Sequence, residues 1–262
     1  MTYHHLCRLG TRLLYQSLTL FTLWTGTGMA ETLVVLGDDS YPPVIHMQSG
    51  VPSGFLVTIL DRASALTGDR YEIHLSPWKR AYEKAIRSEG GVVGISLTQE
   101  RAKLFDFSKP IYDDDIQIVT LATKSFPYTR LEDLRGKTIG GVLGASYGES
   151  VDSAIAGGLF IVERDVSQTG RLRKLLAGRL DAAFIGNGLA GFESVINSQD
   201  DLRTNRALFS ILPTPIARDP LHLAFAKNLN KREALDRFDA AVDKLRKSGE
   251  LKRLANSSIT AK

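Results

Sequence analysis

The chain has 262 residues, with 33 Lys and Arg against 29 Asp and Glu, one cysteine and 43% hydrophobic residues. This composition is that of an ordinary globular protein and excludes collagen-like, coiled-coil and largely disordered chains. The length allows one large domain or two lobes of about 100 residues each.

Residues 1–30 resemble a secretory signal peptide. Arg8 and Arg12 form a basic start, a mostly apolar stretch follows over 13–24, and Gly28-Met29-Ala30 places small residues at a cleavage site. The apolar stretch is about a dozen residues, short of the roughly 20 that a membrane-spanning helix needs. We therefore expect a cleavable signal peptide at 1–30, with a retained membrane anchor as the alternative.

Removal of residues 1–30 takes away two arginines and no acidic residue, so the net charge falls from +4 to +2. No run of Lys and Arg interleaved with aromatic residues remains, so no nucleic-acid partner is expected. Cys7, the only cysteine, precedes the apolar stretch, where a lipid-attachment cysteine would follow it. The mature chain therefore needs neither a lipid anchor nor a disulfide.

The first half of the mature chain alternates strands and helices. An apolar run at 33–36 predicts a buried strand, and helical spacing of apolar residues predicts a helix over 56–66. Further strands are predicted at 71–75 and 92–95, with a helix at 78–87 between them. This β-α-β-α-β order predicts a parallel sheet covered by helices.

Beyond a strand-like stretch at 116–121, the same order starts again. The pattern predicts strands at 137–143, 160–162 and 182–185, with helices at 148–156 and 168–177. An apolar stripe from Leu235 to Leu245 predicts a C-terminal amphipathic helix that Asn230 and Glu233 begin as a capping box. Two such α/β units are expected to enclose a cleft.

Five segments resemble the family 3 extracellular solute-binding proteins, which capture polar amino acids and related small molecules for import. They are LVVLGDDSYPPV (33–44), GFLVTILDRASALTG (54–68), GISLTQERAKLFDFSKPIY (94–112), LLAGRLDAAF (175–184) and LRKSGELKRLAN (245–256). The third, with its Thr-x-x-Arg and Phe-Asp-Phe-Ser-x-Pro, is the most specific. The resemblance implies a two-lobed, periplasmic binding protein-like (type II) α/β fold, in which each lobe is a mainly parallel sheet flanked by helices and two hinge strands join the lobes.

The resemblance places lobe 1 at 31–115 plus 220–262 and lobe 2 at 116–219. It implies a monomeric periplasmic protein without catalytic activity or cofactor. Its expected partners are a small polar organic acid or amino acid and the permease of an ABC transporter in the membrane. One alternative is a periplasmic sensing module that reports its ligand to a membrane receptor.

Arg101 and Ser146 are the principal candidate site residues. A guanidinium pairs two-to-two with a carboxylate, and the resemblance makes Arg101 the carboxylate-binding arginine, with Ser96 supplying hydroxyl and backbone contacts. Ser146 lies in Gly144–Gly148, between a predicted strand and helix, where backbone N–H groups favour an anion. Together Arg101 and Ser146 are expected to clamp one ligand carboxylate from both lobes.

Asp38 and Tyr41 occupy positions where the family contacts the ligand's polar end or side chain, and Trp78 resembles the aromatic that stacks on it. The rest of the predicted site consists of Gly94, Ala145 and Asn187. Asp38, Tyr41 and Trp78 each have an equally good structural explanation, because Asp suits a turn and a Trp suits a core.

Gly186 departs from the family pattern. Amino-acid-binding members carry an Asp a few residues after the GRLDAA segment, where it pairs with the ligand's α-ammonium, and here that position is Gly186. An ammonium buried without an anionic partner is strongly disfavoured. Either Asp38, Asp115 or Glu193 substitutes, or the ligand is not a standard α-amino acid.

Two further motifs suggest other chemistry. Gly144–Gly148 spells the Gly-x-Ser-x-Gly elbow of serine hydrolases, for which Ser146, Asp181 and His222 have the required order, although no Gly-rich oxyanion segment precedes them. The run 113–115 contains three aspartates but lacks the Gly and terminal Glu of a calcium loop. We interpret it as a solvated acidic run beside the hinge and expect no metal.

Overall fold

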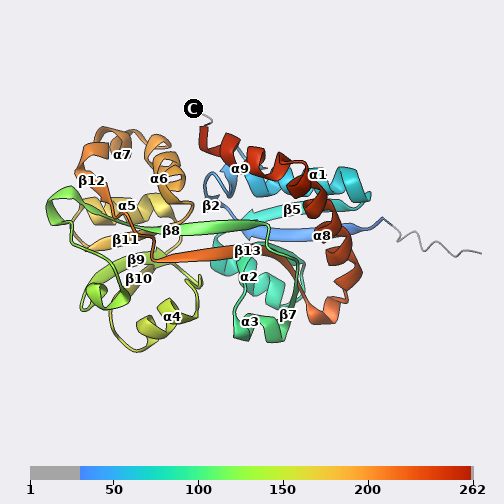
Figure 1. Cartoon of the computed structure of the whole chain (residues 1–262), viewed down its shortest axis with the longest axis horizontal. Coiled ribbons are helices and arrows are strands. Elements are labelled where there is room, and N and C mark those ends of the chain that lie inside the picture. The colour runs from blue at the N-terminus through green and yellow to red at the C-terminus, as the bar shows by residue number, and fades with distance from the viewer. Residues whose placement is uncertain (1–29, 261–262) are drawn as a thin grey trace, which may run out of the picture.

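The structure is a computed structural model and describes residues 30–260, so the predicted signal peptide lies outside the described residues except for Ala30. The molecule consists of two lobes (Figure 1). The strands β8 (Tyr112–Leu121) and β13 (Ala217–Ala226) run from one lobe into the other and are called the hinge strands below. The predicted lobe boundaries at 115/116 and 219/220 fall inside these two strands.

Lobe 1 contains the first elements of the chain and the last. Its strands are β1 (Thr32–Asp38), β5 (Arg70–Ser76), β6 (Gly91–Ser96) and β7 (Phe105–Phe107), and β2 (Ser40–Tyr41), β3 (Ile45–Gln48) and β4 (Val51–Ser53) form a small separate sheet. Its helices are α1 (Phe55–Thr67), α2 (Trp78–Ile86), α3 (Gln99–Leu104), α8 (Arg232–Lys247) and α9 (Glu250–Thr260).

Lobe 2 is formed by the segment between the hinge strands. Its strands are β9 (Thr138–Val142), β10 (Ile161–Asp165), β11 (Ala182–Ile185) and β12 (Phe209–Ile211). Its helices are α4 (Glu149–Ala156), α5 (Gln168–Leu176), α6 (Gly188–Asn197) and α7 (Asp200–Thr204). Short 3-10 turns lie at Ala122–Lys124, Leu131–Leu134, Arg206–Leu208 and Lys227–Leu229.

One continuous sheet passes through both lobes, in the order β10-β9-β11-β8-β13-β6-β1-β5. Within each lobe the strands that alternate with helices are parallel, namely β1 with β5 and β6, and β9 with β10 and β11. The hinge strands are antiparallel to each other and to their neighbours β6 and β11. The predicted two-lobed α/β fold is therefore confirmed, and the ligand-binding edge of each parallel sheet faces the other lobe.

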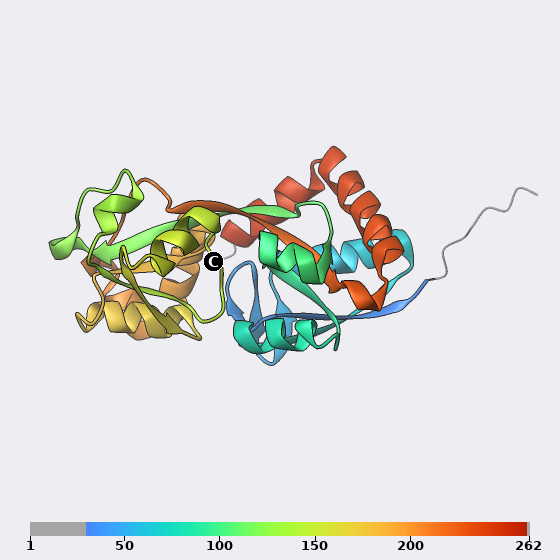
Figure 2. The same ribbon diagram turned by 90° about the horizontal axis from the view of Figure 1, so that it is seen from below.

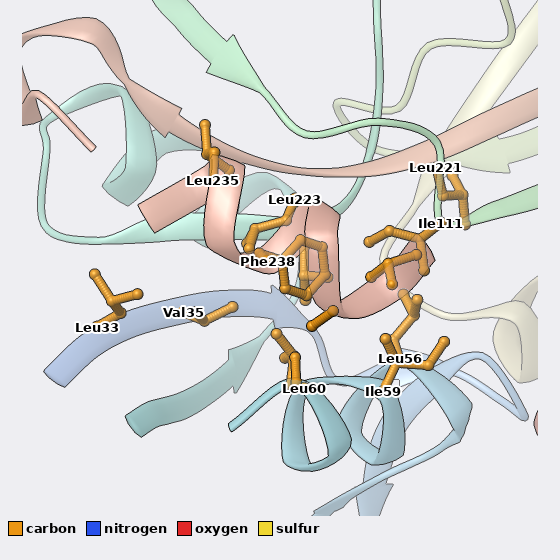
Figure 3. Close-up of a cluster of buried hydrophobic side chains, with 14 of the residues drawn as sticks. Leu33, Val35, Leu56, Ile59, Leu60, Ile111, Leu221, Leu223, Leu235 and Phe238 are labelled. Atoms are coloured by element: carbon orange, nitrogen blue, oxygen red, sulfur yellow. The ribbon is translucent and has the colours of Figure 1, made fainter. Parts of the chain in front are cut away.

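The core of lobe 1 joins distant parts of the chain. Leu33 and Val35 of β1, Leu60 of α1, Leu223 of β13 and Phe238 of α8 meet in one buried cluster (Figure 3). Helices α8 and α9 accordingly lie on lobe 1, beside α1, in both views (Figures 1 and 2). Truncation of a buried phenylalanine such as Phe238 to alanine removes about 3–5 kcal/mol of stability.

The start of α8 differs from the prediction. Asn230 adopts a left-handed conformation at φ 52° at the end of a 3-10 turn, and the helix begins at Arg232 without a side-chain cap. The predicted capping box with Glu233 is therefore wrong, because Asn230 terminates the preceding turn. Over residues 30–260, no helix combines the length and the apolar character that crossing a membrane requires.

Candidate ligand site between the lobes

A cavity of about 70 Å³ lies between the two lobes. Both lobes and both hinge strands line it. Its polar and aromatic lining consists of Asp38, Tyr41, Trp78, Ser96, Asp114, Ser146, Tyr147, Gln168, Arg171 and Asp219, with Gly94, Ala145 and Gly186 where the backbone approaches. Seven of the nine predicted site residues line this cavity, namely Asp38, Tyr41, Trp78, Gly94, Ser96, Ala145 and Ser146.

 The other two, Arg101 and Asn187, are not part of its lining.

Asn187 contacts the lining without being part of it. It adopts a left-handed conformation at φ 61° immediately before α6, and its backbone N–H donates to the carboxylate of Asp114. Its side-chain oxygen accepts a hydrogen bond from the hydroxyl of Tyr112. Asn187 therefore connects lobe 2 to a hinge strand and acts on the cavity through Asp114.

Three buried carboxyl groups line the cavity. Asp38 ends β1, Asp114 lies on β8 and Asp219 on β13, and they are 8%, 3% and 8% exposed. Asp114 and Asp219 are directly opposite each other in the antiparallel pairing of the hinge strands. Opposite residues in such a pair project their side chains to the same face, so both carboxyl groups reach the cavity together.

Each of these carboxyl groups accepts hydrogen bonds from neutral donors. The Tyr41 hydroxyl and the Asn187 backbone N–H donate to Asp114, the Ser96 hydroxyl donates to Asp219 at 2.5 Å, and the Ser40 N–H donates to Asp38 at 3.0 Å. Burial raises the pKa of Asp38 and of Asp114 to about 7, and that of Asp219 to about 6. Near neutral pH these groups are therefore poised between their protonated and charged forms.

Arg171 supplies a positive charge at the cavity wall, but this charge is already paired. Its guanidinium donates to Asp165 at 2.8 Å and to the carbonyl oxygen of Phe184 at 2.5 Å, and the residue is 1% exposed. Its side chain crosses Gly140, where a Cβ would lie 2.5 Å from its Cγ. The fold therefore holds Arg171 as part of the lobe 2 core rather than as a free cation.

Two polar atoms of the lining lack partners. Nε1 of Trp78 and Oε1 of Gln168 are buried and have no hydrogen-bond partner among residues 30–260. A buried donor or acceptor left unpaired costs about 1–3 kcal/mol, so such atoms mark places that a bound molecule can satisfy. One comes from each lobe, since Trp78 begins α2 and Gln168 begins α5.

Arg101 lies behind the cavity wall. Its guanidinium donates to the carbonyl oxygens of Ser96, at 3.0 Å, and of Gly144, at 3.3 Å, and stacks on Tyr82 with its carbon 4.8 Å from the ring centroid. It borders a separate depression between α3 and α4. The arginine thus joins the lobes directly, and its predicted role as a carboxylate ligand stays a prediction.

Ser146 lines both the cavity and the depression beside Arg101, but its hydroxyl is already hydrogen-bonded within the protein. It donates to the carboxylate of Asp152 at 2.5 Å, and the other oxygen of Asp152 accepts from the Tyr147 N–H at 3.0 Å. An internal carboxylate therefore occupies the anion-binding N-terminal turn of α4. The predicted clamp by Ser146 would require the loop before α4 to exchange this partner for the ligand.

Tyr41 occupies the space next to Gly186. A Cβ built on Gly186 would lie 2.7 Å from Cε2 of Tyr41, so no larger residue fits there with the ring in place. Of the acids considered as substitutes for an aspartate at this position, Asp115 pairs with Arg218 at 2.8 Å and Glu193 with Arg206 at 2.6 Å, both away from the cavity. Asp38 alone of the three lines it.

The acidic run at 113–115 is only partly a solvated run. Asp113 is exposed and Asp115 is half-buried in its surface ion pair, but Asp114 is buried in the site. The reason is strand alternation, because Asp114 shares a face with the buried Ile116 and Ile118. The prediction missed Asp114 and Asp219, although extending the two-residue alternation backward from 116–121 would have indicated Asp114.

The residues of the serine hydrolase alternative are not brought together. Ser146 bonds to Asp152, Asp181 is exposed and accepts from the Thr138 N–H at 2.8 Å, and Nδ1 of the buried His222 lies 2.8 Å from the carbonyl oxygen of Ser108. The base therefore lies in the lobe 1 core, so this alternative is wrong. Among residues 30–260, no group of three His, Cys, Asp or Glu side chains could hold a metal.

Comparison with known proteins agrees with this architecture. The chain is 25% identical over 227 residues to the L-cystine-binding protein TcyJ of Escherichia coli K12, covering 86% of this chain and 81% of that protein. It is 26% identical over 172 residues to the probable amino-acid-binding protein YxeM of Bacillus subtilis. That match covers 63% of this chain and spans 61% of the relative's length.

Solved structures share the fold. A histidine kinase sensor domain with similarity to periplasmic binding proteins superposes with a TM-score of 0.73 at 25% identity, covering 86% of this chain and 95% of that one. An ancestral arginine-binding protein bound to arginine superposes with a TM-score of 0.71 at 22% identity, covering 86% and 97%.

The family assignment follows from the length of chain that matches one family model. The model of the bacterial extracellular solute-binding proteins, family 3, matches residues 33–260, nearly all of the described structure. It includes all five segments on which the resemblance rests and both hinge strands. The chain belongs to the family 3 bacterial extracellular solute-binding proteins.

Proposed function

We propose that this protein binds an amino acid or a close relative in the cavity between its lobes and presents it to the permease of an ABC importer. The observation that carries the proposal is the cavity itself, which both lobes line and in which Trp78 Nε1 and Gln168 Oε1 are buried without partners. A solute that satisfies both atoms stabilises the closed arrangement of the lobes. TcyJ and YxeM, whose names state cystine and amino-acid binding, support this solute class.

The same proposal covers location and assembly. A cleavable signal peptide at 1–30 would deliver the chain to the periplasm, where it would act as a monomer and meet the permease. The sensing alternative uses the same cavity and is supported by the similarity to a histidine kinase sensor domain. Ligand-dependent stimulation of a reconstituted ABC importer supports transport, whereas ligand-dependent association with a membrane receptor supports sensing.

The binding step is tested by calorimetry and thermal unfolding of the purified protein with a panel of amino acids and amines. A ligand at 100 times its dissociation constant adds about 2.7 kcal/mol to the free energy of unfolding. Ala145→Trp fills the cavity and should abolish this gain, whereas Ser125→Trp, on an exposed site of lobe 2, should leave it unchanged. Binding that survives Ala145→Trp in a folded protein would place the ligand elsewhere.

A further inference from the structure

We infer that Asp114 and Asp219 together form a cation-binding site on the hinge strands, and that the solute is an organic cation held there through an ammonium or guanidinium group. The inference rests on the proposed function and narrows its solute class. It requires a net positive solute but no carboxylate on it.

The first argument is the pairing of the two acids. Asp114 and Asp219 are directly opposite on adjacent antiparallel strands, which places their Cβ atoms about 4.5–5.5 Å apart. Like charges in such a pair destabilise a sheet, and burial at 3% and 8% exposure strengthens the repulsion. A cation between the two carboxylates would turn this unfavourable pair into a favourable one.

The second argument is the balance of charge at the cavity. Asp38 adds a third buried acid, and among the described residues none of the three forms an ion pair with Lys or Arg. The charge of Arg171 lowers the pKa of Asp38, and that of Arg101 lowers the pKa of Asp219. Burial raises both pKa values by more than these charges lower them. Because Arg171 is paired with Asp165, the lining carries an excess of acidic groups that a bound cation would offset.

The third argument is the surplus of hydrogen-bond acceptors. A carboxylate has about four lone-pair sites, whereas the donors to Asp219 and Asp38 named above use only one or two of them. Gln168 adds an unpartnered Oε1 from lobe 2. An ammonium or guanidinium group consists of donors only and suits this lining.

The fourth argument concerns the groups that would bind a carboxylate. Arg101 donates to the carbonyl oxygens of Ser96 and Gly144, and Ser146 donates to Asp152. Both sides of a carboxylate clamp are thus occupied by groups of the protein. A solute that lacks a carboxylate leaves these bonds intact, so a decarboxylated amine should bind about as well as the amino acid from which it derives.

The test compares matched solutes on matched variants. Isothermal titration calorimetry is run with L-arginine, agmatine, L-lysine, cadaverine, L-glutamine, L-cystine and L-glutamate. We expect the cations to bind best, and agmatine and cadaverine to bind within about tenfold of arginine and lysine, a difference of about 1.4 kcal/mol. Asp114→Asn and Asp219→Asn should each weaken cation binding by at least about tenfold, because each removes one of two buried charges.

Asp115→Asn is the control, since this neighbour on the same strand pairs with Arg218 at the surface and should leave affinity unchanged. Thermal unfolding of the ligand-free variants shows that they fold, and the loss of a buried charge should leave their stability unchanged or raise it. Preferred binding of neutral or acidic compounds, or cation binding unaffected by both Asn variants, would overturn this inference and leave the proposed function standing. Binding of none of the seven compounds would count against both.

Discussion

The ring of Tyr41 lies against Gly186, so that a residue of lobe 1 fills the space beside the backbone of lobe 2. A Cβ at position 186 would lie 2.7 Å from Cε2 of this ring. The Tyr41 hydroxyl in turn donates to Asp114 on β8. The tyrosine therefore depends on the absence of a side chain at position 186, and it in turn orients the hinge carboxylate.

Gly186→Asp should disrupt this arrangement. The new side chain must displace Tyr41, and the overpacking should lower the free energy of unfolding by about 1–3 kcal/mol. Urea denaturation measures the loss. Gly186→Asp should cost less stability when it is added to Tyr41→Ala than when it is added to the wild type, because the ring with which it clashes is then absent. Additive losses in the two variants would show that the two residues do not interact.

Asp114→Asn should stabilise the ligand-free protein at alkaline pH. Because burial raises the pKa of Asp114 from 3.8 to about 7, the native state binds this proton more tightly than the unfolded chain does. Its contribution to stability is full below pH 3.8 and is lost as the pH rises through about 7. The free energy of unfolding of the variant should exceed that of the wild type by about 1–4 kcal/mol at pH 8 and by much less at pH 5, as measured by urea denaturation.

Asp115→Asn is the control for this comparison, because its carboxylate pairs at the surface and should show no such pH dependence. An equal difference between the wild type and Asp114→Asn at both pH values would contradict the prediction.

Cation binding should release protons. Asp38 and Asp114 have pKa values raised to about 7, so both are partly protonated at neutral pH before the ligand arrives. A bound cation favours the charged carboxylates and expels these protons. Agmatine titrated at pH 7 in phosphate and in Tris should give binding enthalpies that differ by the ionisation heat of the buffer, and its affinity should fall as the pH drops toward 5. Identical enthalpies in both buffers would mean that the carboxyl groups do not change protonation.

Arg101→Ala separates a structural arginine from a carboxylate ligand. The side chain is 5% exposed and bonds to the carbonyl oxygen of Gly144 in the other lobe, so its loss should cost about 2–4 kcal/mol of stability. Calorimetry should then show arginine and agmatine affected by the same factor. A loss of affinity for arginine that spares agmatine would establish the carboxylate clamp instead.

The alternation of strands and helices was predictable because periodicity is local. The runs at 33–36, 92–95 and 182–185 are strands, and the spacing of Leu56 to Leu66 marks α1, since one buried face repeats every two or every 3.6 residues. Helix α6 was not predicted, although Phe192, Val195 and Ile196 have helical spacing. The resemblance to a family, rather than periodicity, indicated that the C-terminal helix returns to lobe 1.

The candidate site was less predictable because it depends on direction and pairing across the fold. Nothing local in Thr98-x-x-Arg101 shows that the guanidinium turns onto Tyr82 and Gly144 rather than into the cavity. Nor does the sequence show that Asp114 and Asp219, 105 positions apart, share one register position on the hinge strands. Both facts follow from long-range packing.

The return of α8 to lobe 1 has a consequence for how the molecule forms. Arg237 of α8 contacts Glu31, 206 residues earlier, and Phe238 packs in the same core as Leu33. Lobe 2 can assemble from one continuous stretch, whereas lobe 1 lacks part of its core until the end of the chain is available. Pairing over such separations is slow, and it leaves apolar surface uncovered meanwhile. During synthesis from the N-terminus, the apolar side chains of β1 therefore stay partly exposed until α8 has been made.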